Sequence, residues 1–353
     1  MKRKKTMSNA IKVLIPAILS FISGILLTPI LTHYSYKYKL WRKTSRIDVA
    51  PSLEFKKIYE DSELRTPRTG GMVIWMSVIA TILLVYIISF FVDFETAHKL
   101  NFINRSETLL PFAVLIFASL VGLMDDFVQI FASGRLSGDP IILRYLKIGI
   151  IISLGIMIGW WFYSKLGMDS VHIPFDGTLY LGFLFIPFFV VIMLGVWSTS
   201  VIDGIDGLSG GVLAPIFVAY TVIAFGHGQF NLAAFCAVIT SGILAFLWFN
   251  IPPARFYMGE TGMIGLTVTL CVLAFLTDTV LLLPIIAFPL FLTSLSSIIQ
   301  MVSRKFFKKK VFLVAPLHHH FESLGWPKTK VTMRYWIVAI MTSIIGVVLV
   351  FLQ

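Results

Sequence analysis

The sequence predicts an all-α integral membrane protein with about ten transmembrane helices. Of its 353 residues, 57% are hydrophobic and only 13% are charged, against about 25% charged residues in an average soluble domain. The mean hydropathy is +0.88. Many apolar runs approach or exceed the length of about 20 residues that a helix needs to cross a bilayer. Such runs are too long to be buried strands.

Ten of these runs follow one another in what we expect to be one polytopic domain, 1–353. They are expected to span the membrane at about residues 11–31, 70–93, 108–124, 141–164, 180–199, 208–225, 230–249, 262–277, 280–302 and 334–352. The first follows a basic tail, as in a signal peptide, but no small-residue cleavage site comes after it. We therefore expect it to stay in the protein. Several runs contain Gly or Pro, which are common in membrane helices.

Lys and Arg are divided unequally between the two sets of connections. The connections after spans 1, 3, 5, 7 and 9, with the start of span 4, carry 21 basic residues, and the other side carries eight. Cytoplasmic connections carry the excess of Lys and Arg. The long basic segments 32–69 and 303–333 are therefore expected in the cytoplasm, with both termini outside. The basic N-terminal tail argues for the opposite orientation.

The connection after span 3 begins at two adjacent carboxylates, Asp125 and Asp126. Such a pair can be a solvated helix end or a site for a hard cation. Mg²⁺ is usually held by one or two carboxylates together with substrate phosphates. Successive residues on a helix point in different directions, so one carboxylate can bind the metal while its neighbour acts as a base.

The connection after span 5 carries Asp203 and Asp206 within Asp-Gly-Ile-Asp-Gly. Their spacing of three residues places both carboxylates on one face of a helical turn. Asp-Gly pairs also mark ordinary turns. Two carboxylates between apolar helices favour a binding site, and the glycines would let backbone and ligand approach closely.

The connections after spans 7 and 9 add further polar groups. Glu260 lies between Gly259 and Gly262 in a segment that also resembles an ordinary interfacial loop. Residues 318–320 are three consecutive histidines, which suit a zinc ion poorly because neighbours on a helix diverge by about 100°. Contact with phosphate or a nucleobase fits them better, although an accidental exposed triplet is the alternative.

All these clusters fall in connections of one parity, so all are expected on one membrane face. Carboxylates collect a cation, and a surrounding basic field draws in anions. The pattern therefore indicates phosphoryl transfer between a phosphorylated substrate and a phosphorylated lipid, not nucleic-acid binding. A transporter or channel would instead place carboxylates within spans, along a path through the membrane.

The motifs resemble the polyprenyl-phosphate N-acetylhexosamine-1-phosphate transferase superfamily. Asp125-Asp126, the Asp-Gly-Ile-Asp-Gly connection and the Phe-Asn-x-x-Pro-Ala segment from Phe249 are signals of that superfamily. The stretch 312–331, with its histidines, resembles the phospho-N-acetylmuramoyl-pentapeptide transferase branch more closely. The resemblance implies a Mg²⁺-dependent enzyme that makes lipid I and UMP from UDP-MurNAc-pentapeptide and undecaprenyl phosphate, for peptidoglycan synthesis.

The resemblance also implies roles for particular residues. Asp125, Asp126 and Asp203 would be catalytic, with Asp125 the base, and Asp126 and Glu260 would hold the metal. Substrate-binding residues would be Ser200, Asp206, Tyr257, Gln300, His318, His319 and His320. The family further suggests a homodimer in the plasma (inner) membrane, with the active site in the cytoplasm.

Five positions depart from the family pattern. Glu260 stands for an aspartate, Met263 for a serine and Ser200 for an asparagine, Arg68 replaces a small polar residue, and Gln129 lies near a usual lysine. Two alternatives therefore stay open. The chain is a sibling enzyme that transfers another HexNAc 1-phosphate from its UDP conjugate, or a degenerate, non-catalytic paralogue.

Overall fold

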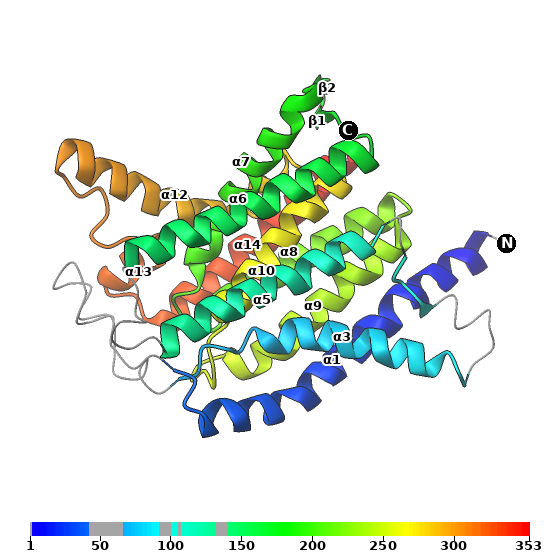
Figure 1. Cartoon of the computed structure of the whole chain (residues 1–353), viewed down its shortest axis with the longest axis horizontal. Coiled ribbons are helices and arrows are strands. Elements are labelled where there is room, and N and C mark those ends of the chain that lie inside the picture. The colour runs from blue at the N-terminus through cyan, green and yellow to red at the C-terminus, as the bar shows by residue number, and fades with distance from the viewer. Residues whose placement is uncertain (1, 42–65, 92–99, 105–106, 132–139) are drawn as a thin grey trace.

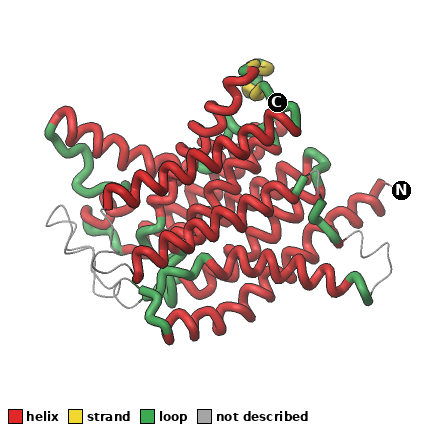
Figure 2. Tube along the Cα trace, in the orientation of Figure 1, coloured by secondary structure: helices red, strands yellow, loops and turns green. Residues whose placement is uncertain are grey.

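The computed structural model describes residues 2–41, 66–91, 100–104, 107–131 and 140–353. Within them the chain is a helical bundle with one two-stranded hairpin (Figure 1, Figure 2). The predicted all-α membrane fold is thus confirmed. Eight helical segments among the described residues are long and apolar enough to cross a membrane.

Each of the ten predicted spans overlaps a helix, and eight of them correspond to helices long and apolar enough to cross a membrane. The first half of the chain forms α1 (Lys2–Lys37), α3 (Met72–Ile88), α5 (Leu109–Phe131), α6 (Pro140–Lys165) and α7 (Phe185–Ser198). The second half forms α8 (Leu208–Gly226), α9 (Phe230–Asn250), α10 (Gly259–Leu276), α11 (Leu283–Ile286), α12 (Phe288–Val302), α13 (Leu317–Ser323) and α14 (Lys328–Phe351).

The predicted ninth span is a broken helix. It divides at Ala287 into α11 and α12, and Pro289 stands in the first turn of α12. Proline has no N–H to continue the hydrogen bonds of a preceding helix, so the break falls just before it. After the break, α12 leaves the bundle and projects to the left in Figure 1.

Helix α10 is the centre of the bundle. Of its 18 residues, 89% are buried, against 28% of the most apolar 18 residues in α6 and in α14. It packs tightly on α5 where two glycines remove side-chain bulk. A Cβ on Gly122 would lie 2.2 Å from the Glu260 carbonyl oxygen, and one on Gly265 would lie 2.1 Å from Ser119 Oγ. Small residues allow close helix contact in membrane proteins, and here they fix α10 against α5.

The remaining helices surround this pair. Helix α1 packs on α9 and α3, α8 packs on α9 and α14, and α6 packs on α7. One contact is specific: Trp336 Nε1 of α14 donates to the carbonyl of Gly207 at the start of α8, 2.9 Å away. This contact holds α14 beside the segment that carries Asp203 and Asp206.

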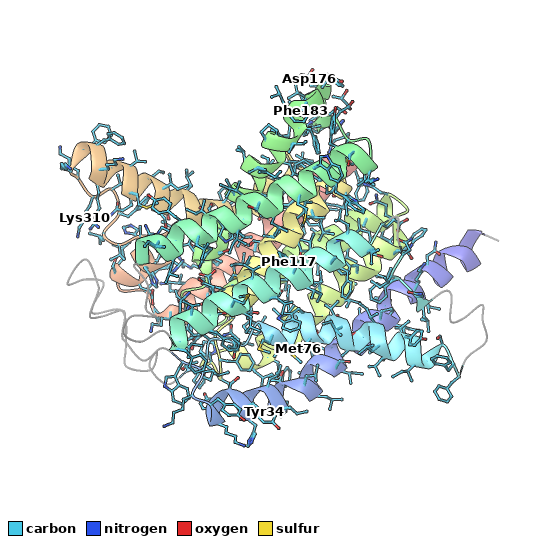
Figure 3. The ribbon with its side chains drawn as sticks, viewed as in Figure 1. Tyr34, Met76, Phe117, Asp176, Phe183 and Lys310 are labelled. Carbon is cyan, nitrogen blue, oxygen red and sulfur yellow. The ribbon has the colours of Figure 1, made fainter. Side chains whose placement is uncertain are left out.

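Successive helices alternate in direction, so the two termini lie on the same side of the bundle in Figure 1. The hairpin of β1 (Ser170–Ile173) and β2 (Gly177–Tyr180), which the sequence did not predict, precedes α7. Figure 3 shows Asp176 at the top on this hairpin and Lys310 at the left beside α12. Of the predicted basic segment 32–69, residues 42–65 lie outside the described part of the chain. Segment 303–333 contains α13 and the start of α14.

The α5–α10 contact predicts a clear stability difference between two glycine substitutions. Gly122→Ala should destabilise the protein by about 1–3 kcal/mol, because the new methyl group meets backbone atoms that have no room to move. The matched change Gly195→Ala, at an exposed site of α7 with no atom within 4 Å of the new Cβ, should leave stability unchanged or slightly raised. Thermal unfolding in detergent measures both, and equal midpoints would contradict the packing described.

Candidate active site

Asp126 of α5 binds the first turn of α10. The carboxylate is fully buried. Its Oδ1 accepts the N–H of Glu260 at 3.1 Å and its Oδ2 accepts the N–H of Thr261 at 2.9 Å. The first N–H groups of a helix have no partner inside the helix, and negative charge is favoured there. Asp126 therefore fixes the position of Glu260 relative to α5.

Gly259 makes this contact possible. Its φ of +68° suits glycine, and a Cβ there would lie 1.9 Å from the carbonyl oxygen of Arg68 and 2.7 Å from Asp126 Oδ2. Its N–H donates to Asp203 Oδ2 at 3.1 Å. The other oxygen of Asp203 accepts the hydroxyl of Ser209 at 2.8 Å. Asp203 thus joins the start of α8 to the start of α10.

Lys147 of α6 lies between two carboxylates. Its Nζ is 2.7 Å from Asp125 Oδ2 and 3.1 Å from Glu260 Oε1, and the three side chains are 19–25% exposed. Gln129 donates to the same oxygen of Asp125 at 2.6 Å. Partly buried charges interact more strongly than exposed ones. The ion pairs therefore draw α5, α6 and α10 together at one point.

Sequence reasoning used Lys147 only as a topological charge and missed this position. A signal was present, because Lys147 stands between Leu146 and Ile148 near the start of an apolar span. A cation within such a span is energetically unfavourable and usually has a partner or a function. The partner carboxylates are far away in sequence, so only the fold identifies them.

Asp206 binds the connection between α9 and α10, close to the residues described above. Its Oδ2 accepts the N–H of Ala254 at 3.1 Å. Burial raises the pKa of Asp206 above its ordinary value, while the Ala254 N–H and the charge of Lys328 oppose that shift. Asn250 stabilises the adjacent turn by accepting the N–H of Gly207 at 2.9 Å and donating to the carbonyl of Phe256 at 2.8 Å.

Two of the three histidines face the Asp203–Asp206 segment. A Cβ on Gly204 would lie 2.5 Å from His318 Nε2 and 3.1 Å from His319 Nε2. Both histidines are buried. His320 instead turns to its own connection, where its Nδ1 accepts the N–H of Leu313 at 3.3 Å. The structure thus brings His318 and His319, but not the His320 ring, against the aspartate segment.

The other predicted substrate residues make local contacts. Gln300 accepts the N–H groups of Val311 and Phe312, both at 3.0 Å, and donates to the Phe312 carbonyl. Ser200 donates its hydroxyl to the Trp197 carbonyl at 2.7 Å. Tyr257 is half-buried in the connection after α9. The substrate roles of all three stay predictions.

Arg68 brings a buried cation to the site. It is 8% exposed, and its charge acts on Asp126. Its segment is hydrogen-bonded to the connection after α9, where Tyr257 N donates to Pro67 O at 2.8 Å and Gly70 N donates to Tyr257 O at 2.9 Å. Within the described part of the chain, Arg68 Nε is buried without a hydrogen-bond partner. A donor in this condition is suited to an anionic ligand.

The carboxylates suit a hard cation only in part. Among the described residues, no group of three or more His, Cys, Asp or Glu side chains is arranged to hold a metal ion. However, Asp125 and Glu260 both point at Lys147 Nζ. Mg²⁺ needs only one or two carboxylates when waters and substrate phosphates supply the other ligands. The donor chemistry therefore fits Mg²⁺ bound together with a phosphorylated substrate.

A groove opens between α5 and α6 beside these charges. It has a volume of about 520 Å³, and its lining includes Phe117, Tyr145, Leu146, Gly149 and Met157. Figure 3 labels Phe117 where α5 meets this groove. The space beside Gly149 is open, because a Cβ there would meet no atom within 4 Å. The groove is mostly apolar and lies one turn from Lys147, so it suits a lipid chain.

Comparison with known proteins shows relatives over nearly the whole chain. The family described as Glycosyl transferase family 4 matches residues 108–278. The chain is 32% identical over 334 residues, 94% of its length and 95% of the relative's, to the phospho-N-acetylmuramoyl-pentapeptide-transferase of Geobacillus sp. (strain WCH70). It is 30% identical over 340 residues to the protein of that name from Clostridium perfringens (strain 13 / Type A), covering 95% of this chain and 98% of that one.

The buried carboxylate of α5 predicts the effect of a nearly isosteric change. Asparagine has only one side-chain oxygen, so Asp126→Asn can accept only one of the N–H groups of Glu260 and Thr261. Its amide NH₂ group, which is a donor, then faces the other N–H. The free energy of unfolding should fall by about 1–3 kcal/mol, the cost of a buried unpaired group. Thermal unfolding without metal or substrate measures it, with Asp176→Asn on the exposed hairpin as the control. Full stability of Asp126→Asn would show that the two hydrogen bonds do not hold α10.

Proposed function

Because the chain belongs to the phospho-N-acetylmuramoyl-pentapeptide-transferase family, we propose that it transfers phospho-MurNAc-pentapeptide from UDP-MurNAc-pentapeptide to undecaprenyl phosphate. The reaction requires Mg²⁺, gives lipid I and UMP, and serves peptidoglycan synthesis and cell shape. The protein acts in the plasma membrane with its site facing the cytoplasm, as a homodimer.

One observation carries the proposal. Five segments distant in sequence meet at one face of the bundle through Arg68, Asp126, Asp203, Glu260 and His318. Carboxylates, a buried arginine and histidines in one place suit a metal-bound diphosphate. In phosphoryl transfer, protein groups mainly position the reactants and neutralise charge, and this arrangement supplies groups for both tasks.

Asp125 is the group best placed to act on the lipid phosphate. Lys147 and Gln129 both contact its Oδ2, which orients the carboxylate beside the α5–α6 groove. A lipid-phosphate oxygen forms a bond to the β-phosphorus of the UDP conjugate, the bond from that phosphorus to the bridging oxygen breaks, and UMP leaves. Asp125 takes the proton of the attacking phosphate when that phosphate is protonated.

Glu260 and Asp126 divide the work of metal binding. Glu260 is the more exposed carboxylate and would contact the ion, whereas Asp126 holds the helix turn that carries Glu260. When bound, Mg²⁺ neutralises the diphosphate and orients it. Glu260 is one methylene longer than aspartate, and its contact with Lys147 gives that length a defined position.

The nucleotide part of the substrate has its own contacts. Asp203 and Asp206 line the diphosphate and nucleotide pocket with Ser200 and Gln300, and Tyr257 stacks on the uracil. His318 and His319 border the phosphates, whereas His320, whose ring contacts Leu313, would need to turn to join them. The unpartnered Nε of Arg68 supports this placement, since it supplies a donor to an anion. The acceptor lipid would reach Asp125 along the groove between α5 and α6.

The proposed reaction predicts release of UMP by the purified protein. With undecaprenyl phosphate and Mg²⁺, UMP should form from UDP-MurNAc-pentapeptide and not from UDP-GlcNAc, and chelation should stop it. Turnover only with UDP-GlcNAc would identify a sibling transferase instead. No UMP from either substrate would identify a non-catalytic paralogue.

Replacing the proposed base tests its role. Asp125→Asn should lower kcat by about 10²–10⁴-fold, the usual contribution of a general base. Binding of the UDP substrate, measured by calorimetry, should stay within a few-fold of the original. Activity near that of the unmodified protein would exclude Asp125 from the chemistry.

Filling the groove tests the path of the acceptor lipid. Gly149→Trp should raise KM for undecaprenyl phosphate by about tenfold, or ~1.4 kcal/mol, and leave KM for the UDP substrate unchanged. The matched change Gly195→Trp, also at an open helical site, should alter neither. If both KM values rose together in Gly149→Trp, the groove would not be specific to the lipid.

A further inference from the structure

A second apolar pocket lies away from the carboxylates, where α12 leaves the bundle. It has a volume of about 270 Å³ and is lined by α12, α13 and α14, with Leu292, Leu317, Phe321 and Val338 among its apolar residues. Drug-sized ligands usually occupy pockets of about 300–1,000 Å³ lined with a few polar groups. A smaller, largely apolar pocket is better suited to a slender hydrocarbon chain.

The rim of this pocket carries two cations on one aromatic ring. Trp326 stacks on Phe321 with centroids 4.8 Å apart. Arg334 Cζ lies 4.3 Å and Lys330 Nζ 4.7 Å from the Trp326 ring. Among the described residues, neither Lys330 nor Arg334 forms an ion pair with a carboxylate. Two adjacent cations without a carboxylate partner attract an anion.

The pocket and its rim are arranged as a lipid would require. Lys330 and Arg334 are exposed and stand in the first two turns of α14, which begins at Lys328. Val338 follows one turn further along the same helix and lines the pocket. The charged groups are thus at the end of the span, and the apolar space continues from them toward its middle. Basic side chains in this position attract anionic lipid headgroups.

We propose that this pocket binds an anionic phospholipid. One acyl chain occupies the space between α12 and α14, and the phosphate lies against Lys330 and Arg334. The site is separate from the proposed reaction centre, because α13 lies between them. Leu317 and Phe321 of α13 line the pocket, whereas His318 and His319 of the same helix face Gly204. A polyprenyl phosphate bound here would hold its phosphate on the wrong side of α13 for transfer.

The lipid would stabilise the elements that position the histidines. It contacts α12, α13 and α14 at once, and α12 otherwise diverges from the bundle (Figure 1). Occupancy should therefore raise the thermal stability of the protein, whether or not a UDP substrate is present. That readout is independent of catalysis, so it remains informative even if the proposed reaction fails.

The test compares lipids with and without negative charge. Phosphatidylglycerol added to the detergent-solubilised full chain should raise the unfolding midpoint and stay bound in native mass spectrometry, and phosphatidylcholine should do neither. Lys330→Gln with Arg334→Gln should weaken phosphatidylglycerol binding about tenfold or more. The control, Lys305→Gln with Lys309→Gln, removes the same charge from exposed positions after α12 and should keep the binding.

A second variant tests the acyl chain separately from the charges. Val338→Trp fills the pocket and leaves both cations in place, so it should also lose bound phosphatidylglycerol. Its unfolding midpoint without lipid should match that of the unmodified protein, which shows that it folds. Equal effects of the two lipids, binding retained in both variants, or displacement by equimolar undecaprenyl phosphate would overturn the proposal.

Discussion

The two hydrogen bonds from the first turn of α10 to Asp126 are the contact on which this face of the protein depends. They connect α5 to the central helix of the bundle and fix the backbone of Glu260 and Thr261. Gly122 and Gly259 allow the approach, because a side chain at either position would meet backbone atoms. The same turn donates the N–H of Gly259 to Asp203 Oδ2. The buried carboxylate of Asp126 therefore helps to determine where Glu260 and Asp203 lie.

Lys147 balances the negative charge of two of these carboxylates. Its ammonium lies between Asp125 and Glu260, and Arg68 supplies a second buried charge near Asp126. Carboxylates this close would otherwise repel one another. Three of the five departures that the resemblance implies, at Arg68, Gln129 and Glu260, thus form part of one charge arrangement, in which Gln129 contacts Asp125 and Glu260 extends to Lys147. This mutual contact favours a preserved site over a degraded one.

The sequence predicted the helices well, because an apolar run of this length in a bilayer must satisfy its backbone hydrogen bonds within the segment, and a helix does so. It also placed Asp126, Asp203 and Glu260 on one face, since parity alone decides which connections meet. It missed the break at Ala287, the hairpin after α6 and the position of Lys147. Each depends on tertiary packing: the partners of Lys147, for example, are 22 and 113 positions away. The hydrogen bonds that Gln300 accepts from Val311 and Phe312 could not be predicted for the same reason.

The sidedness of the connections is the most direct test of the account. Cys236 and Cys271 are buried, so single cysteines can be introduced at exposed Lys37, Asp176 and Lys309 and labelled with a membrane-impermeant maleimide. In intact cells, the position on the hairpin should react, and the two positions after α1 and α12 should react only after lysis. If the position after α1 and the one after α12 were labelled from opposite sides, the carboxylates and histidines would not share a compartment and the proposed site would be wrong.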